Sequence, residues 1–168
     1  MRGVAIILME ARTGREKQRY TAGKTRQVAG CVPVNTETRQ VLLVTQRKKS
    51  GWVLPKGGWE NDESQQEAAA RETYEEAGAK GKVTHFLGQW DSLTINNATG
   101  CPKKMFLFFE MEVDSVEDKW PEMQERNRAW FAYEEAVKMI GEPFMREVLK
   151  QCSLAPTSNQ NTTASIGC

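Results

Sequence analysis

The sequence predicts an α/β domain, on two observations. Segments that carry the β-branched and aromatic residues typical of strands are followed or separated by segments with apolar residues at helical spacing. A chain of 168 residues also falls within the usual size of a single domain and is long enough to enclose one core. We therefore expect one compact domain built from strands and helices.

The strand-like segments extend over most of the chain. Residues 28–34 (VAGCVPV) and 41–46 (VLLVTQ) stand on either side of a turn-like NTETRQ and predict two strands with a short connection. Residues 83–90 (VTHFLGQW) and 105–113 (MFLFFEMEV) predict two more strands, and the second of these suits a mixed sheet. Residues 92–104 (SLTINNATGCPKK) predict the loop between them.

A helix is predicted over residues 64–77, SQQEAAARETYEEA. This segment is dense in Ala, Glu and Gln, which favour helices, and it contains neither Gly nor Pro. Ser64 or Asp62 can cap its start, and Glu67 stands three residues after Ser64, as a capping box requires. Gly78 occupies the position of a C-terminal cap, so the sequence defines both ends of this helix.

The remaining segments complete the domain organisation. Apolar residues at helical spacing predict two short helices, over residues 133–140 and 144–152. Residues 1–24 are expected to be an N-terminal arm, partly irregular because its second half is basic, polar and broken by glycines. Residues 25–152 are expected to form the folded domain. The tail, 153–168, is rich in Ser, Thr and Asn, so we expect it to be mobile and disordered.

Composition excludes several classes of function. The 23 Lys and Arg residues nearly balance the 22 Asp and Glu residues, and a net charge of +1 gives no overall field that would recruit nucleic acid or a membrane surface. Four cysteines without C-x-x-C spacing and a single histidine argue against a zinc site. The apolar run GVAIILM (residues 3–9) is too short to span a bilayer. We expect a reducing location, the cytoplasm, the nucleus or both.

Three carboxylates are crowded on the predicted helix. Glu72, Glu75 and Glu76 are spaced i, i+3 and i+4, which places them on one side of a single turn. One interpretation is a solvated helix face. The other is a metal site, because like charges at this spacing repel and a divalent cation would neutralise them. Oxygen ligands of this kind suit Mg²⁺, with Mn²⁺ as the alternative.

A longer pattern favours the metal site. The segment fits G-x5-E-x7-R-E-U-x-E-E-x-G-U, where U is a bulky apolar residue, and on this pattern the sequence resembles the Nudix hydrolase family. The fixed positions are filled by Gly57, Glu63, Arg71, Glu72, Glu75, Glu76 and Gly78. The two U positions hold Thr73 and Ala79, which are smaller than the pattern prefers and concern packing. The resemblance implies the Nudix fold, an α/β/α sandwich around a central mixed β-sheet with a loop-helix-loop catalytic motif.

The resemblance also implies a role for each position of the motif. Glu72 and Glu76 would bind the metal together with the backbone carbonyl of Lys56. Glu75 would act as general base or as a further ligand, and Arg71 would orient the glutamates through charge-assisted hydrogen bonds.

Other positions of the motif have supporting roles in this family. Glu63 and Gly78 would hold the loop-helix-loop together, while Gly57 and Gly58 would let the backbone turn beside bound metal and substrate phosphate. The implied reaction is attack of water on phosphorus, with cleavage of a phosphoanhydride bond.

Beyond the motif, the chain resembles the diphosphoinositol polyphosphate and diadenosine polyphosphate phosphohydrolases, notably the fungal members. The segments GREKQRY (14–20), TRQVAGC (25–31) and WVLPKGG (52–58) carry this similarity. Such substrates are polyanions, so several cations must converge near the metal. The resemblance implies this role for Arg26, Arg47, Lys48, Lys104 and Arg126.

Three functions stay open at this point. The first is hydrolysis of diphosphoinositol polyphosphates and diadenosine polyphosphates, with inorganic polyphosphate as a further substrate. The second is a different Nudix specificity, such as nucleotide sugars, nucleoside triphosphates or mRNA caps, although no RNA-binding module is present in the sequence. The third is a Nudix-fold protein that senses a phosphorylated ligand without cleaving it. Trp59 and Trp90 are candidates for stacking on an adenine, or for ordinary packing.

Overall fold

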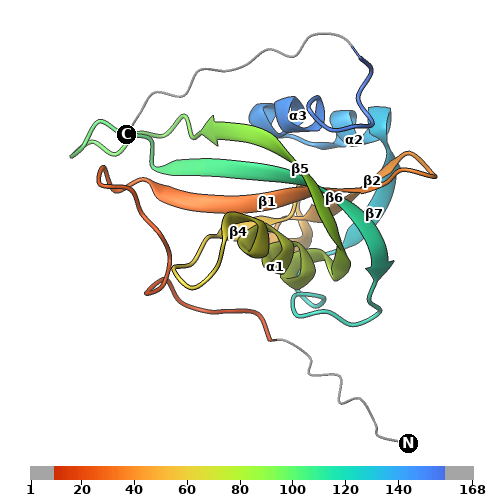
Figure 1. Cartoon of the computed structure of the whole chain (residues 1–168), viewed down its shortest axis with the longest axis horizontal. Helices are drawn as coiled ribbons and strands as arrows, with labels where there is room; N and C mark the ends of the chain where they lie inside the picture. Colours follow the sequence, from red (N-terminus) through yellow and green to blue (C-terminus); the bar gives the residue numbers. More distant parts are fainter. Residues whose placement is uncertain (1–9, 158–168) are drawn as a thin grey trace, which may run out of the picture.

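The computed structural model describes residues 10–157, which form a seven-stranded mixed sheet with helices on both faces (Figure 1). The strands are β1 (Arg26–Asn35), β2 (Gln40–Thr45), β3 (Trp52–Val53), β4 (Lys56–Gly58), β5 (Ala79–Asp91), β6 (Lys104–Val116) and β7 (Arg128–Ala132). Their order is β3-β2-β1-β6-β5, while β4 pairs with β1 and β7 pairs with β2. The central strands β1 and β6 are parallel, and the other pairs are antiparallel.

The helices cover the two faces of this sheet. In Figure 1, α1 (Gln65–Ala77) lies on one face, and α2 (Tyr133–Met139) and α3 (Pro143–Leu149) lie on the opposite face. A short 3₁₀ helix, η1 (Arg47–Lys49), follows β2. This is the predicted α/β/α sandwich around a mixed sheet.

The alternation of side chains along β1 divides the core into two layers. Val28, Val32 and Val34 point to the layer that contains α2 and α3, and Ala29 and Cys31 point to the layer under α1. That second layer contains small residues, including Ala29 and Ala68, which are completely buried. Small side chains at this interface let α1 lie close to the sheet, and α1 carries the predicted catalytic carboxylates.

Both ends of α1 are fixed as the sequence predicted. The Ser64 side chain accepts a hydrogen bond from the backbone N–H of Glu67, and the Glu67 side chain accepts one from the backbone N–H of Ser64. At the other end, Gly78 has a left-handed backbone (φ 65°), and its N–H donates to the carbonyl of Tyr74. The capping box and the Gly78 cap are therefore confirmed.

Some predicted boundaries were wrong. The structure contains β3, β4 and β7, which the sequence patterns did not reveal as strands. The predicted tail begins too early, because Leu154 is 2% exposed and belongs to the core. The Ser153 N–H also donates to Glu110 Oε1, and the Leu154 carbonyl accepts from Arg39. The apolar run 3–9 and residues 158–168 lie outside the described residues.

Candidate active site

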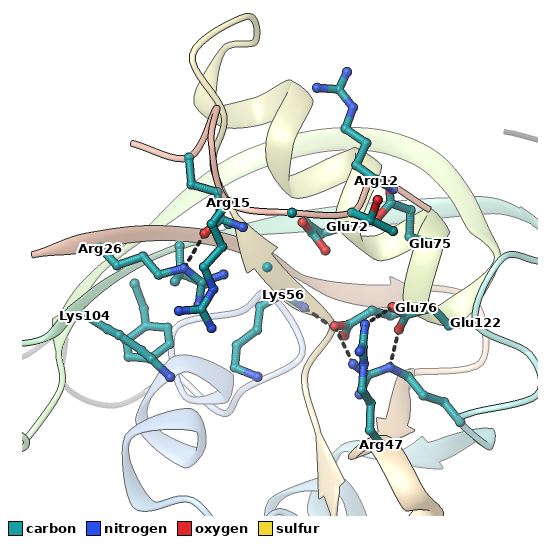
Figure 2. A pocket seen from close by; sticks show the side chains of 18 residues that line it. Arg12, Arg15, Arg26, Arg47, Lys56, Glu72, Glu75, Glu76, Lys104 and Glu122 are labelled. Atoms are coloured by element: carbon teal, nitrogen blue, oxygen red, sulfur yellow. Dashed lines mark hydrogen bonds and ion pairs between the residues drawn. The ribbon is translucent and has the colours of Figure 1, made fainter. Parts of the chain in front are cut away.

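A cavity of about 510 Å³ lies beside α1 and β4 (Figure 2). Segments that are far apart in the sequence line it: the arm, β4 with α1, the first residues of β1 and β6, and the loop before β7. Glu72, Glu75 and Glu76 reach it from α1. The single turn of helix predicted for these carboxylates therefore faces a recess and not open solvent.

Burial makes the three carboxylates difficult to ionise. Burial raises the pKa of Glu72 to about 8, against the opposing charge of Arg71, and the neighbouring Glu75 and Glu76 raise it further. Burial likewise raises the pKa of Glu76 to about 7, although Arg126 and Lys56 lower it. The pKa of Glu75 is raised for the same first reason. The positive charges near these carboxylates therefore do not fully offset the effect of burial.

Arg71, in the middle of α1, ties the helix to β4 and to the loop between them. Its Nε and Nη2 donate to the two carboxylate oxygens of Glu63 at 2.9 and 2.7 Å, and its Nη2 also donates to the Gly58 carbonyl at 2.9 Å. Its Nη1 donates to Glu72 at 2.8 Å and to Glu75 at 3.3 Å. Because Glu63 also accepts the backbone N–H of Glu60, the arginine is fixed in position and orients two of the carboxylates.

A second buried arginine holds the third carboxylate. Arg126 Nη2 donates to Glu76 Oε1 at 2.9 Å, and its Nη1 donates to the carbonyl of Thr45. Its Nε donates to Glu122, which is 6% exposed and also pairs with Arg47 at 2.8 Å. The result is a chain of alternating charges, Glu76–Arg126–Glu122–Arg47, running from α1 to η1.

The backbone of β4 presents oxygen and N–H groups to the same carboxylates. In the antiparallel β1–β4 pair, Cys31 and Trp59 donate across the ladder, so by alternation the groups of Lys56 point away from β1. The Lys56 N–H donates to Glu76 Oε2 at 3.2 Å, and the Lys56 carbonyl leaves the strand on the same side. A Cβ at Gly57 would stand 2.0 Å from the carboxyl carbon of Glu72, so this approach requires glycine.

These donors fit a hard divalent cation. Glu72, Glu76 and the Lys56 carbonyl supply the oxygen ligands that Mg²⁺ prefers, and a cation would offset the burial that raises both carboxylate pKa values. Within residues 10–157, no group of three or more His, Cys, Asp or Glu side chains is gathered tightly enough to be recognised as a metal site. The proposed ligand set includes a backbone oxygen, and Arg71 and Arg126 hold the carboxylates separately.

The cations that line the cavity fall into two groups. Arg12, Arg47 and Arg126 are paired with carboxylates: Arg12 with Glu60 and Asp62, and the other two with Glu122. The second group has no carboxylate partner in the described part of the chain and consists of Arg15, Arg26, Lys56 and Lys104. In Figure 2 these four residues lie toward one side of the cavity, and Glu75 and Glu76 lie toward the other.

The unpaired cations are held close to one another. Arg26 and Lys104 are directly opposite in the parallel β1–β6 register, where like charges repel. Burial lowers the pKa of Arg26, and the charge of Arg15 lowers it further. Burial also lowers the pKa of Lys56, the charge of Glu76 opposes this shift, and the charges of Arg126 and Lys104 add to it. Positive charge is therefore concentrated here, and within residues 10–157 no carboxylate forms a salt bridge with these four cations.

The structure brings most of the predicted site residues together. Among the predicted phosphate contacts, Arg26, Arg47, Lys104 and Arg126 line the cavity, as do Gly57 and Gly58. Lys48 does not line it and lies in the exposed η1 segment, with a left-handed backbone (φ 66°). Sequence patterns did not identify Arg12, Arg15, Gln18 or Glu122 as site residues.

Gln18 and Arg12 show how the arm takes part. Gln18 Oε1 accepts a hydrogen bond from Arg26 Nε at 2.6 Å, and the backbone N–H of Arg12 donates to Glu75 Oε1 at 3.2 Å. The sequence signal for Gln18 was its place in GREKQRY (14–20), a segment that carries the resemblance to the phosphohydrolases, and Arg12 lies outside that segment. The signal for Glu122 was its i, i+4 spacing to Arg126, which is weak without a structure.

Comparisons with known proteins agree with this site. Residues 24–152 match the family model described as "NUDIX domain". The chain is 39% identical to Nudix hydrolase 4 of Arabidopsis thaliana over 155 residues, which cover 86% of this chain and 73% of that protein. It is 30% identical to diphosphoinositol polyphosphate phosphohydrolase 2 of Rattus norvegicus over 149 residues, covering 85% of this chain and 79% of that protein.

A solved structure shares the fold. A NUDIX hydrolase from Nitrosomonas europaea superposes with a TM-score of 0.62 at 20% identity, covering 76% of this chain and 88% of that one. No helix within residues 10–157 is long and apolar enough to cross a membrane. The family model spans both halves of the cavity, from the cations at the start of β1 to the carboxylates of α1. The chain therefore belongs to the NUDIX domain family and is a Nudix hydrolase.

Proposed function

We propose that this protein is a Mg²⁺-dependent hydrolase of diphosphoinositol polyphosphates and diadenosine polyphosphates, with inorganic polyphosphate as a further substrate. The observation that carries the proposal is the group of cations without carboxylate partners, Arg15, Arg26, Lys56 and Lys104, beside the carboxylates of α1. A substrate with many phosphates supplies the anions that these cations lack. The identity with the rat diphosphoinositol polyphosphate phosphohydrolase supports the same substrate class.

The roles of the residues follow from their contacts. Glu72, Glu76 and the Lys56 carbonyl would hold Mg²⁺, which when bound neutralises charge on phosphate oxygens and lowers the pKa of water. Arg71 keeps Glu72 and Glu75 oriented, and Arg126 does the same for Glu76. Glu75 accepts the proton of the attacking water, because no hydrogen bond within residues 10–157 uses its Oε2.

The substrate is tested by direct turnover. The purified protein with Mg²⁺ is incubated with diphosphoinositol pentakisphosphate, diadenosine hexaphosphate, ADP-ribose and capped RNA, and products are separated by ion-exchange chromatography. We expect cleavage of the first two compounds. Rapid turnover of ADP-ribose or capped RNA alone would show a different Nudix specificity, and binding of the polyphosphates without any turnover would show a sensor.

The catalytic centre is tested by Glu76→Gln. Loss of this carboxylate should lower kcat by more than about 100-fold, because losing even a residue that supports a metal ligand costs about 10- to 100-fold. Glu135→Gln, at an exposed position of α2, is the matched control and should retain the full rate. A near-normal rate for Glu76→Gln, with an unchanged circular dichroism spectrum, would place the metal elsewhere.

The cellular location expected from the sequence, the cytoplasm or nucleus, stays a prediction. Relatives from Arabidopsis thaliana are named as mitochondrial or chloroplastic, as in "Nudix hydrolase 17, mitochondrial". Microscopy of the full-length chain fused at its C-terminus to a fluorescent protein tests the location.

A further inference from the structure

The cavity offers no ring on which a nucleobase can stack. Apart from glycine, its lining within residues 10–157 is polar or charged, with the exceptions of Val28 and Phe106. These two side chains are 3% and 6% exposed, so they form the buried floor and present almost no surface. Residues 1–9 and 158–168 contain no aromatic residue or histidine, so they cannot supply such a ring.

The two tryptophans suggested by the sequence are engaged elsewhere. The guanidinium of Arg19 lies over Trp59, 4.1 Å from the ring centroid, and Trp59 Nε1 donates to the Glu63 carbonyl. Trp90 makes an edge contact with Phe108 at a centroid distance of 6.2 Å. Neither residue lines the cavity. Stacking on adenine would therefore require displacing existing contacts.

The groups left to bind a ligand are cations and backbone. Arg15, Arg26, Lys56 and Lys104 have no carboxylate partner in the part of the chain that the structure describes, and Lys56 is the most deeply placed of them, between Glu76 and Lys104 (Figure 2). Cations of this kind recognise phosphate oxygens through charge and hydrogen bonds. Contacts of this kind do not recognise what the phosphates are attached to.

We propose that the cavity recognises its substrate through phosphate groups alone and that a nucleobase contributes no binding. The ligand class is a densely charged chain or cluster of phosphates. The inositol ring or nucleoside to which these phosphates are attached lies outside the cavity. This inference rests on the proposed function and ranks its substrates: compact polyphosphate anions bind best, and dinucleotides bind through their phosphate bridge. Tyr20, 47% exposed and bridged to Arg26 through the backbone, is the aromatic residue best placed to contradict this.

The first experiment removes the base. kcat/KM is measured with Mg²⁺ for diadenosine hexaphosphate and for its abasic analogue, in which hydrogen replaces each adenine and the phosphate bridge is the same. We expect the two values to agree within about threefold, since stacking of one base would be worth about five- to 150-fold. A larger preference for the dinucleotide would overturn the proposal. So would a Tyr20→Ala variant that loses activity on dinucleotides and keeps it on diphosphoinositol pentakisphosphate.

The second experiment needs no turnover. Isothermal titration of the metal-free protein is carried out with inositol hexakisphosphate, tripolyphosphate and adenosine. We expect both phosphate compounds to bind and adenosine not to bind. Lys56→Met should weaken both phosphate compounds by at least about fivefold, while Lys82→Met, an exposed lysine of β5, should change neither.

The outcomes separate this inference from the proposed function. Binding of the phosphate compounds without hydrolysis of any substrate would refute the proposed function and keep the phosphate site. Binding of adenosine, or equal affinities for the Lys56→Met variant and the original protein, would refute the phosphate-only site even if hydrolysis is observed.

Discussion

At the scale of single residues, Glu122 connects the site to the rest of the fold. It is buried between Arg126 and Arg47, and its backbone N–H donates to the Glu75 carbonyl. Through Arg126 it also determines where the Glu76 carboxylate points. A residue outside the Nudix motif therefore controls the geometry of a residue inside it.

Replacing Glu122 by Ala should lower the free energy of unfolding by about 2–3 kcal/mol, because Arg126 and Arg47 lose a buried carboxylate acceptor, although Arg126 keeps its pair with Glu76. Glu125→Ala is the control, since the Glu125 side chain is 52% exposed and pairs with Arg47 at the surface. That variant should change the unfolding free energy by about 1 kcal/mol or less. Urea denaturation measures both, and equal effects would contradict the structural role of Glu122.

A buried thiol predicts how stability depends on pH. Burial raises the pKa of Cys31 to about 12, whereas an unfolded thiol ionises near pH ~8.5. Above that pH the unfolded state loses its proton and the folded state does not, so stability falls as pH rises. By pH ~10.5 this contribution reaches about 2–3 kcal/mol.

Cys31→Ser removes the ionisable group and keeps a polar atom beside Thr73. The variant should lose less stability than the original protein between pH 8 and pH ~10.5, whatever its stability at pH 7. Cys101→Ser, at a partly exposed position, is the control and should follow the original protein. Parallel pH profiles for all three proteins would show that Cys31 is not responsible.

At the scale of elements, α1 is the segment that local sequence specifies most completely. Helix formers, a capping box and a C-terminal glycine all lie within residues 64–78, so its bounds and its row of carboxylates could be predicted. β3 and β4 could not, because two or three residues carry no measurable alternation. β7 is a strand because it pairs with β2, which lies far away in the sequence.

The same distinction applies to the site. The Nudix motif is contiguous, so Glu72, Glu75, Glu76 and Arg71 could be assigned to the site from the resemblance to the family. Arg15 and Gln18 reach the cavity only because the arm folds back beside the end of β4, where Gln18 forms a backbone bridge with Glu60, two residues after the strand. Which basic residues are neutralised internally also depends on tertiary contacts, and composition cannot reveal it.

The capping box gives a prediction at the scale of this element. Ser64→Ala should lower the free energy of unfolding by about 1 kcal/mol, because the backbone N–H of Glu67 loses its acceptor. Gln66→Ala, at an exposed position in the same first turn, is the matched control and should change it by less than about 0.5 kcal/mol. Thermal and urea unfolding measure the difference, and an equal response of both variants would mean that the cap contributes nothing.

At the scale of the whole molecule, the domain ends later than its composition suggests. Residues 153–157 (SLAPT) contain a single large apolar side chain, yet this residue, Leu154, packs into the core cluster that also contains Cys152. A chain that ends after Cys152 should be less stable by about 2–3 kcal/mol than one that ends after Thr157, because it loses a buried leucine and the Ser153 hydrogen bond to Glu110. Equal melting temperatures for the two truncated chains would show that this segment is not part of the domain.

The two outer strands of the sheet have a consequence for the protein in a crowded solution. β5, at one end of the strand order, pairs with β6 through three register shifts, between Lys80 and Gly81, Val83 and His85, and Phe86 and Gly88. At the other end, β7 pairs with the side of β2 that faces away from β1, is five residues long and is followed directly by α2. An irregular strand and a short one are poor templates for adding a foreign strand. The sheet that supports this site therefore offers little opportunity for edge-to-edge aggregation.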